Sequence, residues 1–336
     1  MPGFRPAHAL TLAVLAAAAF VAPALAQKAA SITDKSAVAK PHDKKADDKK
    51  ADDKKTNGTK SASVNPTVQP EKPAKELFGA KTLPAHMQAR AIGFYAKGCL
   101  AGAQALPIAG ATWQVMRLSR NRNWGHPNLI AMLERLAAKA KTAGWNGLLV
   151  GDISQPRGGP MLTGHASHQV GLDADIWLTP MPDHTLTREE RETMSATMIV
   201  APSRLDVDPK VWTPQHVAVV KAAAEDAQVE RIFVNAAIKK ALCRDAGKDR
   251  AWLHKVRPYW GHDYHMHIRI KCPEGSTHCK SQPPVPEGDG CAAKDLAWWF
   301  RDSVIHPKPP TKPAKPRPGI KLADLPAECR QVLLAP

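Results

Sequence analysis

Two short segments carry most of the side chains in this chain that are suited to binding a metal ion or transferring a proton. One covers residues 164–178 (GHASHQVGLDADIWL) and the other covers residues 260–270 (WGHDYHMHIRI). A catalytic zinc site commonly takes three nitrogen or oxygen ligands from the protein and keeps one position for water. The candidate side chains are His165, His168, Asp173 and Asp175 in the first segment, and His262, His265 and His267 in the second.

The second segment predicts a strand over residues 264–270. Side chains alternate between the two faces of a strand, so His265 and His267 share one face. Two imidazoles on one face can both bind one ion, or one can bind it while the other acts as an acid or base. We favour the second arrangement, with zinc held by His168, Asp175 and His267.

His265 is then the residue that takes and returns a proton, because this role needs a group that titrates near neutrality. The zinc ion would acidify water and polarise a substrate carbonyl. His262 lies just before the strand and is placed to line the same cavity. A single surface histidine carries no such meaning, so the prediction depends on the clustering of these side chains in two short motifs.

Other catalytic motifs are absent from the sequence. It contains no HExxH helix, no GxSxG nucleophile motif and no GxxxxGK[ST] phosphate loop. The six cysteines include no CxxC pair, so a cysteine zinc cluster and a cysteine nucleophile are both disfavoured. Six cysteines, an even number, in an exported protein predict three disulfides. The sequence alone does not choose among the possible pairings.

Residues 1–26 are typical of a secretory signal peptide. An Ala-rich and Leu-rich run follows Arg5, and Ala24, Leu25 and Ala26 match a small-x-small cleavage site. The alternative is an uncleaved membrane anchor, but the run is short for a membrane span. We therefore expect a periplasmic protein with no transmembrane span after cleavage.

Residues 27–75 predict a disordered linker. They contain the near-repeat DKKADDKKADDKK and few large apolar side chains, so ordering them would bury little. The chain has a net charge of +16, and much of the excess lies in this linker and in residues 306–321. That distribution disfavours a nucleic-acid-binding groove, but it permits weak electrostatic contact with anionic envelope polymers.

Residues 76–336 predict one folded α+β domain, with an antiparallel sheet flanked by helices and stapled by disulfides. Helices and strands do not alternate regularly, which favours this class over a regular α/β fold. The proline-rich residues 307–319 predict an extended strap across the domain. The main expected elements are helices over residues 129–140, 214–227, 236–244 and 294–301, and strands over residues 147–153, 231–234 and 264–270.

With these motifs the sequence resembles the penicillin-insensitive murein endopeptidases. They belong to a wider group of zinc peptidases that includes lysostaphin-type enzymes, D-Ala-D-Ala enzymes and hedgehog domains. The shared pattern is a His, an Asp seven residues later and a downstream His-x-His, which here is His168, Asp175 and His265-Met266-His267. The resemblance also covers VMRLSRNRNWGHP, RIFVNAAIKKALC and KVRPYWGHDYHMHIRIKCP, and spans residues 99–329.

The resemblance implies a periplasmic zinc endopeptidase that hydrolyses D-alanyl–meso-diaminopimelyl cross-links in peptidoglycan. It implies zinc on His168, Asp175 and His267, and a catalytic role for His265. His165 and His262 match further histidines of the family's cleft. The disulfides that it implies are Cys99–Cys329, Cys243–Cys291 and Cys272–Cys279.

Members of the resembled family can carry an additional metal ion, for which His165 is the matching candidate. That second site also needs an aspartate and a histidine from a later stretch. Here residues 203–212 (SRLDVDPKVW) contain no histidine. We therefore expect one stable zinc ion.

Two alternatives remain open from the sequence. One is a D,D- or L,D-carboxypeptidase acting on single stem peptides, because the loops around a cleft decide which bond is cut. The other is a non-catalytic wall-binding protein that retains a zinc site. The presence of His265 favours catalysis over binding alone.

Overall fold

The computed structural model describes residues 72–309 and 319–336. The predicted signal peptide (1–26), nearly all of the predicted linker (27–75) and most of the predicted strap (307–319) lie outside these residues. All of the candidate site residues lie within them.

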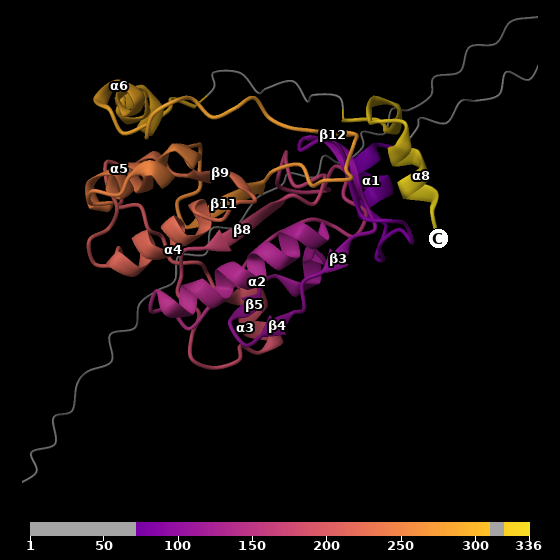
Figure 1. The fold of residues 1–336 in the computed structure, drawn as a ribbon, viewed down its shortest axis with the longest axis horizontal. Coiled ribbons are helices and arrows are strands. Elements are labelled where there is room, and N and C mark those ends of the chain that lie inside the picture. The colour runs from indigo at the N-terminus through magenta and orange to yellow at the C-terminus, as the bar shows by residue number, and fades with distance from the viewer. Residues whose placement is uncertain (1–71, 310–318) are drawn as a thin grey trace, which may run out of the picture. The chain divides into compact units, whose positions relative to one another are not determined.

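A seven-stranded sheet forms the centre of the described domain (Figure 1). In order across the sheet, the strands are β10 (Val256–Pro258), β9 (Val229–Val234), β11 (His265–Ile270), β8 (Asp173–Trp177), β7 (Leu148–Val150), β5 (Trp113–Val115) and β4 (Ala109–Gly110). The neighbours β9, β11, β8 and β7 pair antiparallel, as do β5 and β4. However, β10 pairs parallel to β9, and β5 pairs parallel to β7.

The predicted α+β class is confirmed, but the expectation of a wholly antiparallel sheet is wrong at these two pairs. Each parallel pair is joined by a segment that contains a helix. These helices are α2 (Pro127–Thr142), between β5 and β7, and α5 (Ala236–Asp245), between β9 and β10. Parallel neighbours need such a crossover connection. The sequence pattern did not reveal it, because β5 and β10 are only three residues long.

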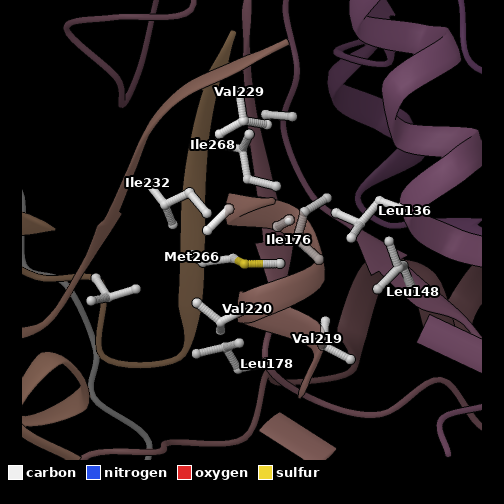
Figure 2. Close-up of a cluster of buried hydrophobic side chains, with 14 of the residues drawn as sticks. Leu136, Leu148, Ile176, Leu178, Val219, Val220, Val229, Ile232, Met266 and Ile268 are labelled. Atoms are coloured by element: carbon white, nitrogen blue, oxygen red, sulfur yellow. The ribbon is translucent and has the colours of Figure 1, made fainter. Parts of the chain in front are cut away.

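One face of the sheet is buried under α2 and α4 (Pro214–Ala224) (Figures 1 and 2). Met266 and Ile268 of β11 and Ile176 of β8 point into this apolar cluster. Burying an aliphatic side chain of this size contributes roughly 1.5–3 kcal/mol. The cluster therefore fixes which residues of each strand face the helices and which face away. The cluster residues labelled in Figure 2 are Leu136, Leu148, Ile176, Leu178, Val219, Val220, Val229, Ile232, Met266 and Ile268.

The predicted helices are present with shifted ends. Helix α2 begins at Pro127, and the Nδ1 atom of His126 accepts a hydrogen bond from the backbone N–H of Asn128 at its start. The helix expected over residues 294–301 is instead α6 (Ala293–Leu296) followed by a 3₁₀ turn, a common form at helix ends. The other described α-helices are α1 (Ala74–Gly79), α3 (Arg188–Thr193), α7 (Asp302–Ile305) and α8 (Glu328–Leu334).

A second, smaller apolar cluster lies where α1 and α8 meet a three-stranded sheet (Figure 1). The disulfide Cys99–Cys329 joins this sheet to α8 inside the cluster. The strands of the sheet are β12 (Cys279–Lys280), β1 (Arg90–Phe94) and β2 (Lys97–Ala101), and a separate short pair consists of β3 (Gln104–Ala105) and β6 (Trp124–Gly125).

Two further disulfides, Cys243–Cys291 and Cys272–Cys279, complete the set. The three pairs are those that the family resemblance implies. None of the helices in the described part of the chain is long and apolar enough to cross a membrane.

Candidate metal centre

Strands β8 and β11 bring the two candidate segments together on the open face of the sheet. Their register places His267 opposite Asp175, and Arg269 opposite Asp173. These residues alternate with the side chains that face α2 and α4, so they point to the other side. His265 lies on the same face of β11, which places four of the candidate side chains next to one another.

His168 reaches this face from the loop that precedes β8. Its backbone φ of 66° lies in the left-handed region, which is uncommon for a residue with a side chain and frequent at functional sites. The Ser154 hydroxyl donates to the His168 carbonyl at 2.7 Å and helps to hold this conformation. The ring Nδ1 lies 2.5 Å from the carbonyl oxygen of Ile153 and donates to it. The Nε2 lone pair is therefore free to face the site.

Asp175 lies at the centre of the cluster. Its Oδ1 is 3.2 Å from Nδ1 of His267, 3.5 Å from Nε2 of His168 and 3.7 Å from Nε2 of His265. Burial raises the pKa of Asp175, but the neighbouring His168 and His267 outweigh it and hold the pKa well below the usual range. The carboxylate is therefore ionised and ready to serve as a ligand.

Asp173 fixes the orientation of the His267 ring. The Oδ1 atom of Asp173 accepts from Nε2 of His267 at 2.7 Å and from Nε of Arg269 at 2.7 Å. With a proton on Nε2, His267 turns its Nδ1 atom toward Oδ1 of Asp175, 3.2 Å away, where the neutral ring can serve as a ligand. Such outer hydrogen bonds to a ligating histidine set its tautomer and raise its basicity.

The buried atoms at this junction fit a cation. Among the described residues, Nε2 of His168 and Oδ1 of Asp175 are buried and have no hydrogen-bond partner. Leaving a buried polar atom unpaired costs about 1–3 kcal/mol, and a bound cation would satisfy both atoms. Two imidazole nitrogens and one carboxylate oxygen form a donor set that suits zinc.

His165 offers a second way to complete the donor set. One ligand atom from each of His165, His168 and Asp175 all lie within 4.8 Å of one another, so these three residues can hold a metal ion. The Nδ1 atom of His165 is 3.5 Å from Oδ2 of Asp175. The predicted set uses His267 in place of His165, and both sets share His168 and Asp175.

Asp152 belongs to the site but was missed in the sequence. Its Oδ2 lies 3.0 Å from Nε2 of His165 and 2.9 Å from a guanidinium nitrogen of Arg122. Burial raises the pKa of Asp152, but the bond to His165 and the charges of Arg122 and Arg120 lower it to about 2. Asp152 lies just after β7 and 13 residues before His165, outside both motifs, and no sequence pattern marks it as part of the site.

His265 and His262 lie side by side at the edge of the site. Their ring centroids are 4.8 Å apart. Burial lowers the pKa of His265, although Asp175 opposes the shift. Burial, with a contribution from His265, lowers the pKa of His262 to about 4. Both rings are therefore neutral at neutral pH, and a neutral imidazole can accept a proton.

The cluster lies between two cavities that share His165, Tyr264 and His265. The first has a volume of about 330 Å³, and its lining includes Asp175 and Trp177. The second has a volume of about 400 Å³ and contains the aromatic side chains Tyr95, Phe233, Tyr259 and Trp260 beside His262 and His267. Open space therefore extends from the candidate ligands in two directions.

The stretch over residues 203–212 does not add a histidine to the site, and its first acidic residue has other partners. Asp206 lies 3.1 Å from the Lys240 ammonium and 3.0 Å from the Arg244 guanidinium. Its carboxylate is thus engaged in ion pairs with both side chains.

Residues 91–334 match the family model described as penicillin-insensitive murein endopeptidase. The chain is 47% identical over 251 residues to the protein of that name from Haemophilus influenzae, an alignment covering 74% of this chain and 84% of that protein. It is 43% identical to the protein of that name from Klebsiella pneumoniae subsp. pneumoniae, covering 75% and 89% of the two chains. The protein of that name from Yersinia pestis is 44% identical, covering 73% and 85%. The match extends over most of the chain and includes both segments that form the cluster, so this chain belongs to the penicillin-insensitive murein endopeptidase family.

Proposed function

We propose that this protein is a periplasmic zinc metalloendopeptidase that hydrolyses D-alanyl–meso-diaminopimelyl cross-links in peptidoglycan. Membership of a murein endopeptidase family supports the substrate and the reaction class. The predicted signal peptide supports the compartment. The observation that carries the zinc assignment is the buried convergence of His168 Nε2, Asp175 Oδ1 and His267 Nδ1, two of which have no other partner.

His168, Asp175 and His267 would hold the zinc ion, with His165 next to them. Bound zinc supplies a Lewis acid that polarises the scissile carbonyl and lowers the pKa of water. His265 is the general base and then the acid: its neutral ring takes a proton from the attacking water and gives it to the departing amine. Its low pKa keeps it in the accepting form at neutral pH.

The second supporting observation is the pair of cavities. An endopeptidase must accommodate peptide on both sides of the scissile bond, whereas a carboxypeptidase needs room for only one terminal residue on the amine side. Both cavities reach His265, and each has a volume of at least about 330 Å³. This arrangement favours cleavage of a cross-link over removal of a terminal residue.

The test is digestion of purified cross-linked muropeptide dimers, with the products identified by mass spectrometry. We expect zinc-dependent conversion of dimers into monomers, with activity abolished by a chelator and lowered at least about 100-fold in His267→Ala and His265→Ala. His184→Ala, at an exposed histidine outside both cavities, is the control and should retain activity. Release of terminal D-alanine without loss of dimers would instead identify a carboxypeptidase.

A further inference from the structure

Three arginines gather beside the first cavity, and their hydrogen bonds separate them into different roles. Arg117 and Arg120 line the cavity, whereas Arg122 reaches Asp152 beside it. An arginine that uses most of its five N–H donors on protein acceptors stabilises the fold, while one that uses few of them is available to a ligand.

Arg117 and Arg122 are committed to the protein. The guanidinium of Arg117 donates to three backbone carbonyls at the C-terminal end of α3, those of Arg191, Glu192 and Met194. Arg122 donates to Asp152 at 2.9 Å and to the carbonyl and hydroxyl oxygens of Thr163 at 2.9 and 3.1 Å. Each guanidinium thus uses three of its five N–H donors within the protein.

Arg120 differs from both. Its side chain is 47% exposed, and among the described residues it makes one hydrogen bond, from Nη1 to Asp152 at 3.0 Å. Asp152 does not depend on it, because Arg122 and His165 already bind the same carboxylate. Most of the N–H donors of Arg120 are therefore free at the wall of a cavity that also contains Asp175 and His265.

The backbone that carries Arg120 is held rigidly. Arg117 and Asn121, which flank the short 3₁₀ turn Leu118–Arg120, both have left-handed φ values, 57° and 51°. The backbone N–H and the hydroxyl of Ser119 both donate to Glu192, at 2.7 and 2.9 Å. A cation on such a support is pre-organised for an anionic ligand, which lowers the entropy cost of binding.

Among the described residues that line the second cavity, none is an equivalent cation. Arg269 lines it, but its Nε is bonded to Asp173 at 2.7 Å and its Nη1 to Gln282 at 2.5 Å. Its Cζ lies 3.5 Å above the centre of the Tyr95 ring, which covers a face of the guanidinium. Of the arginines described at the two cavities, Arg120 therefore keeps the most N–H donors free, and it lies on the side of the first cavity.

We propose that Arg120 is a specificity-determining residue that binds the carboxylate nearest to the scissile bond. The inference rests on the proposed function. In a D-alanyl–meso-diaminopimelyl cross-link, the carbon attached to the scissile nitrogen also carries a free carboxylate, whereas the acyl side begins with an uncharged alanyl residue. A guanidinium recognises a carboxylate by charge-assisted hydrogen bonds. Arg120 thus assigns the first cavity to the amine side of the bond and the aromatic second cavity to the acyl side.

The test uses two synthetic cross-linked dimers that differ only at this group, a free carboxylate or a carboxamide. The zinc-loaded wild-type enzyme is expected to cleave the acid about 10-fold to 100-fold better in kcat/KM, the range that a charge-assisted hydrogen bond supports. Arg120→Gln should remove the preference by raising KM for the acid, with the carboxamide cleaved within about twofold of wild type. Arg120→Lys should restore part of the preference, because it returns the charge without the planar fork.

Arg135→Gln is the matched control. Arg135 is 46% exposed and pairs with the buried Asp226, much as Arg120 pairs with Asp152, but it lies on α2 outside both cavities. This variant should keep the wild-type preference. Equal loss of activity on both dimers in Arg120→Gln would overturn the proposal, because it would mean that Arg120 only supports Asp152. A wild-type enzyme that does not distinguish the two dimers would overturn it as well.

A binding measurement separates this inference from the proposed function. Two peptides are titrated into the zinc-loaded protein by calorimetry. The first is the amine-side product, which is a stem peptide with a free diaminopimelyl carboxylate, and the second is the same peptide with that carboxylate replaced by a carboxamide. Tighter binding of the acid, lost in Arg120→Gln, supports the carboxylate site even if the dimers are not cleaved. Equal binding of the two peptides rejects the carboxylate site while leaving any measured endopeptidase activity intact.

Discussion

At the scale of single residues, Asp175 links every part of the candidate site. Its Oδ1 faces the rings of His168, His265 and His267, and its Oδ2 faces His165. The alternation of side chains along the strand predicted that His265 and His267 share one face. Their different roles were a further hypothesis. The alternation did not indicate which nitrogen of each ring points inward, because this is set by acceptors from other parts of the chain.

We predict that Asp173→Ala lowers zinc affinity by about 10-fold to 100-fold, the usual effect of losing an outer partner of a ligating histidine. The reason is that Nε2 of His267 loses the carboxylate that fixes its tautomer. Competition with a chromophoric chelator measures the change. Asp226→Ala removes another buried aspartate paired with an arginine, away from the site, and should lower stability without changing zinc affinity. Equal affinities in Asp173→Ala and wild type would contradict the proposed role.

At the scale of elements, the two strands that carry the site differ in how well the sequence predicts them. Strand β11 alternates histidines with apolar residues, and this pattern was sufficient to place it. Strand β8 (DADIW) was not predicted, because both of its faces are buried and its aspartates are unusual in strands. It is a strand because β11 and β7 pair with it on either side.

The alternation in β11 predicts that stability and metal binding can be changed separately. Met266→Ala creates a cavity under α2 and α4 and should reduce the free energy of unfolding by about 2–5 kcal/mol. Because Met266 faces away from the site, the folded variant should still bind one zinc ion. His267→Ala should show the reverse, with zinc binding lost and a smaller change in the stability of the metal-free protein. Denaturant unfolding and zinc stoichiometry measure both effects, and loss of zinc in folded Met266→Ala would show that the two faces are not independent.

At the scale of the whole molecule, contacts between distant segments are the part that the sequence could not predict. Strand β1 pairs in parallel with β12, with Gly93 beside Cys279. The sequence does not reveal this pair, because β12 has only two residues and the five residues of β1 (RAIGF) do not alternate between polar and apolar. Asp152 joins the site through contacts over shorter separations, with His165 13 residues away and Arg122 30 residues away. In contrast, the apolar spacing of α2 is local information, and the predicted helix closely matches the observed one.

A disulfide should stabilise the molecule more when it closes a longer segment of chain, with an effect that grows as the logarithm of the segment's length. Cys99–Cys329 spans 230 residues and Cys272–Cys279 spans 7. In the chain-entropy model, these values correspond to about 5 and about 2–3 kcal/mol. We therefore predict that replacing both Cys99 and Cys329 by Ser reduces the free energy of unfolding about twice as much as replacing Cys272 and Cys279.

Denaturant unfolding of the two double variants measures this difference in the free energy of unfolding. Zinc binding shows which region of the molecule loses stability. The Cys99–Cys329 bond lies in the smaller apolar cluster, whereas the proposed ligands Asp175 and His267 lie on strands anchored by the larger one. Hence the variant lacking this bond should bind zinc normally at low denaturant and lose the α1 and α8 region first. If both variants lose equal stability, the stabilisation does not come from chain entropy. If the long-range variant loses zinc while still folded, the two clusters form one cooperative unit.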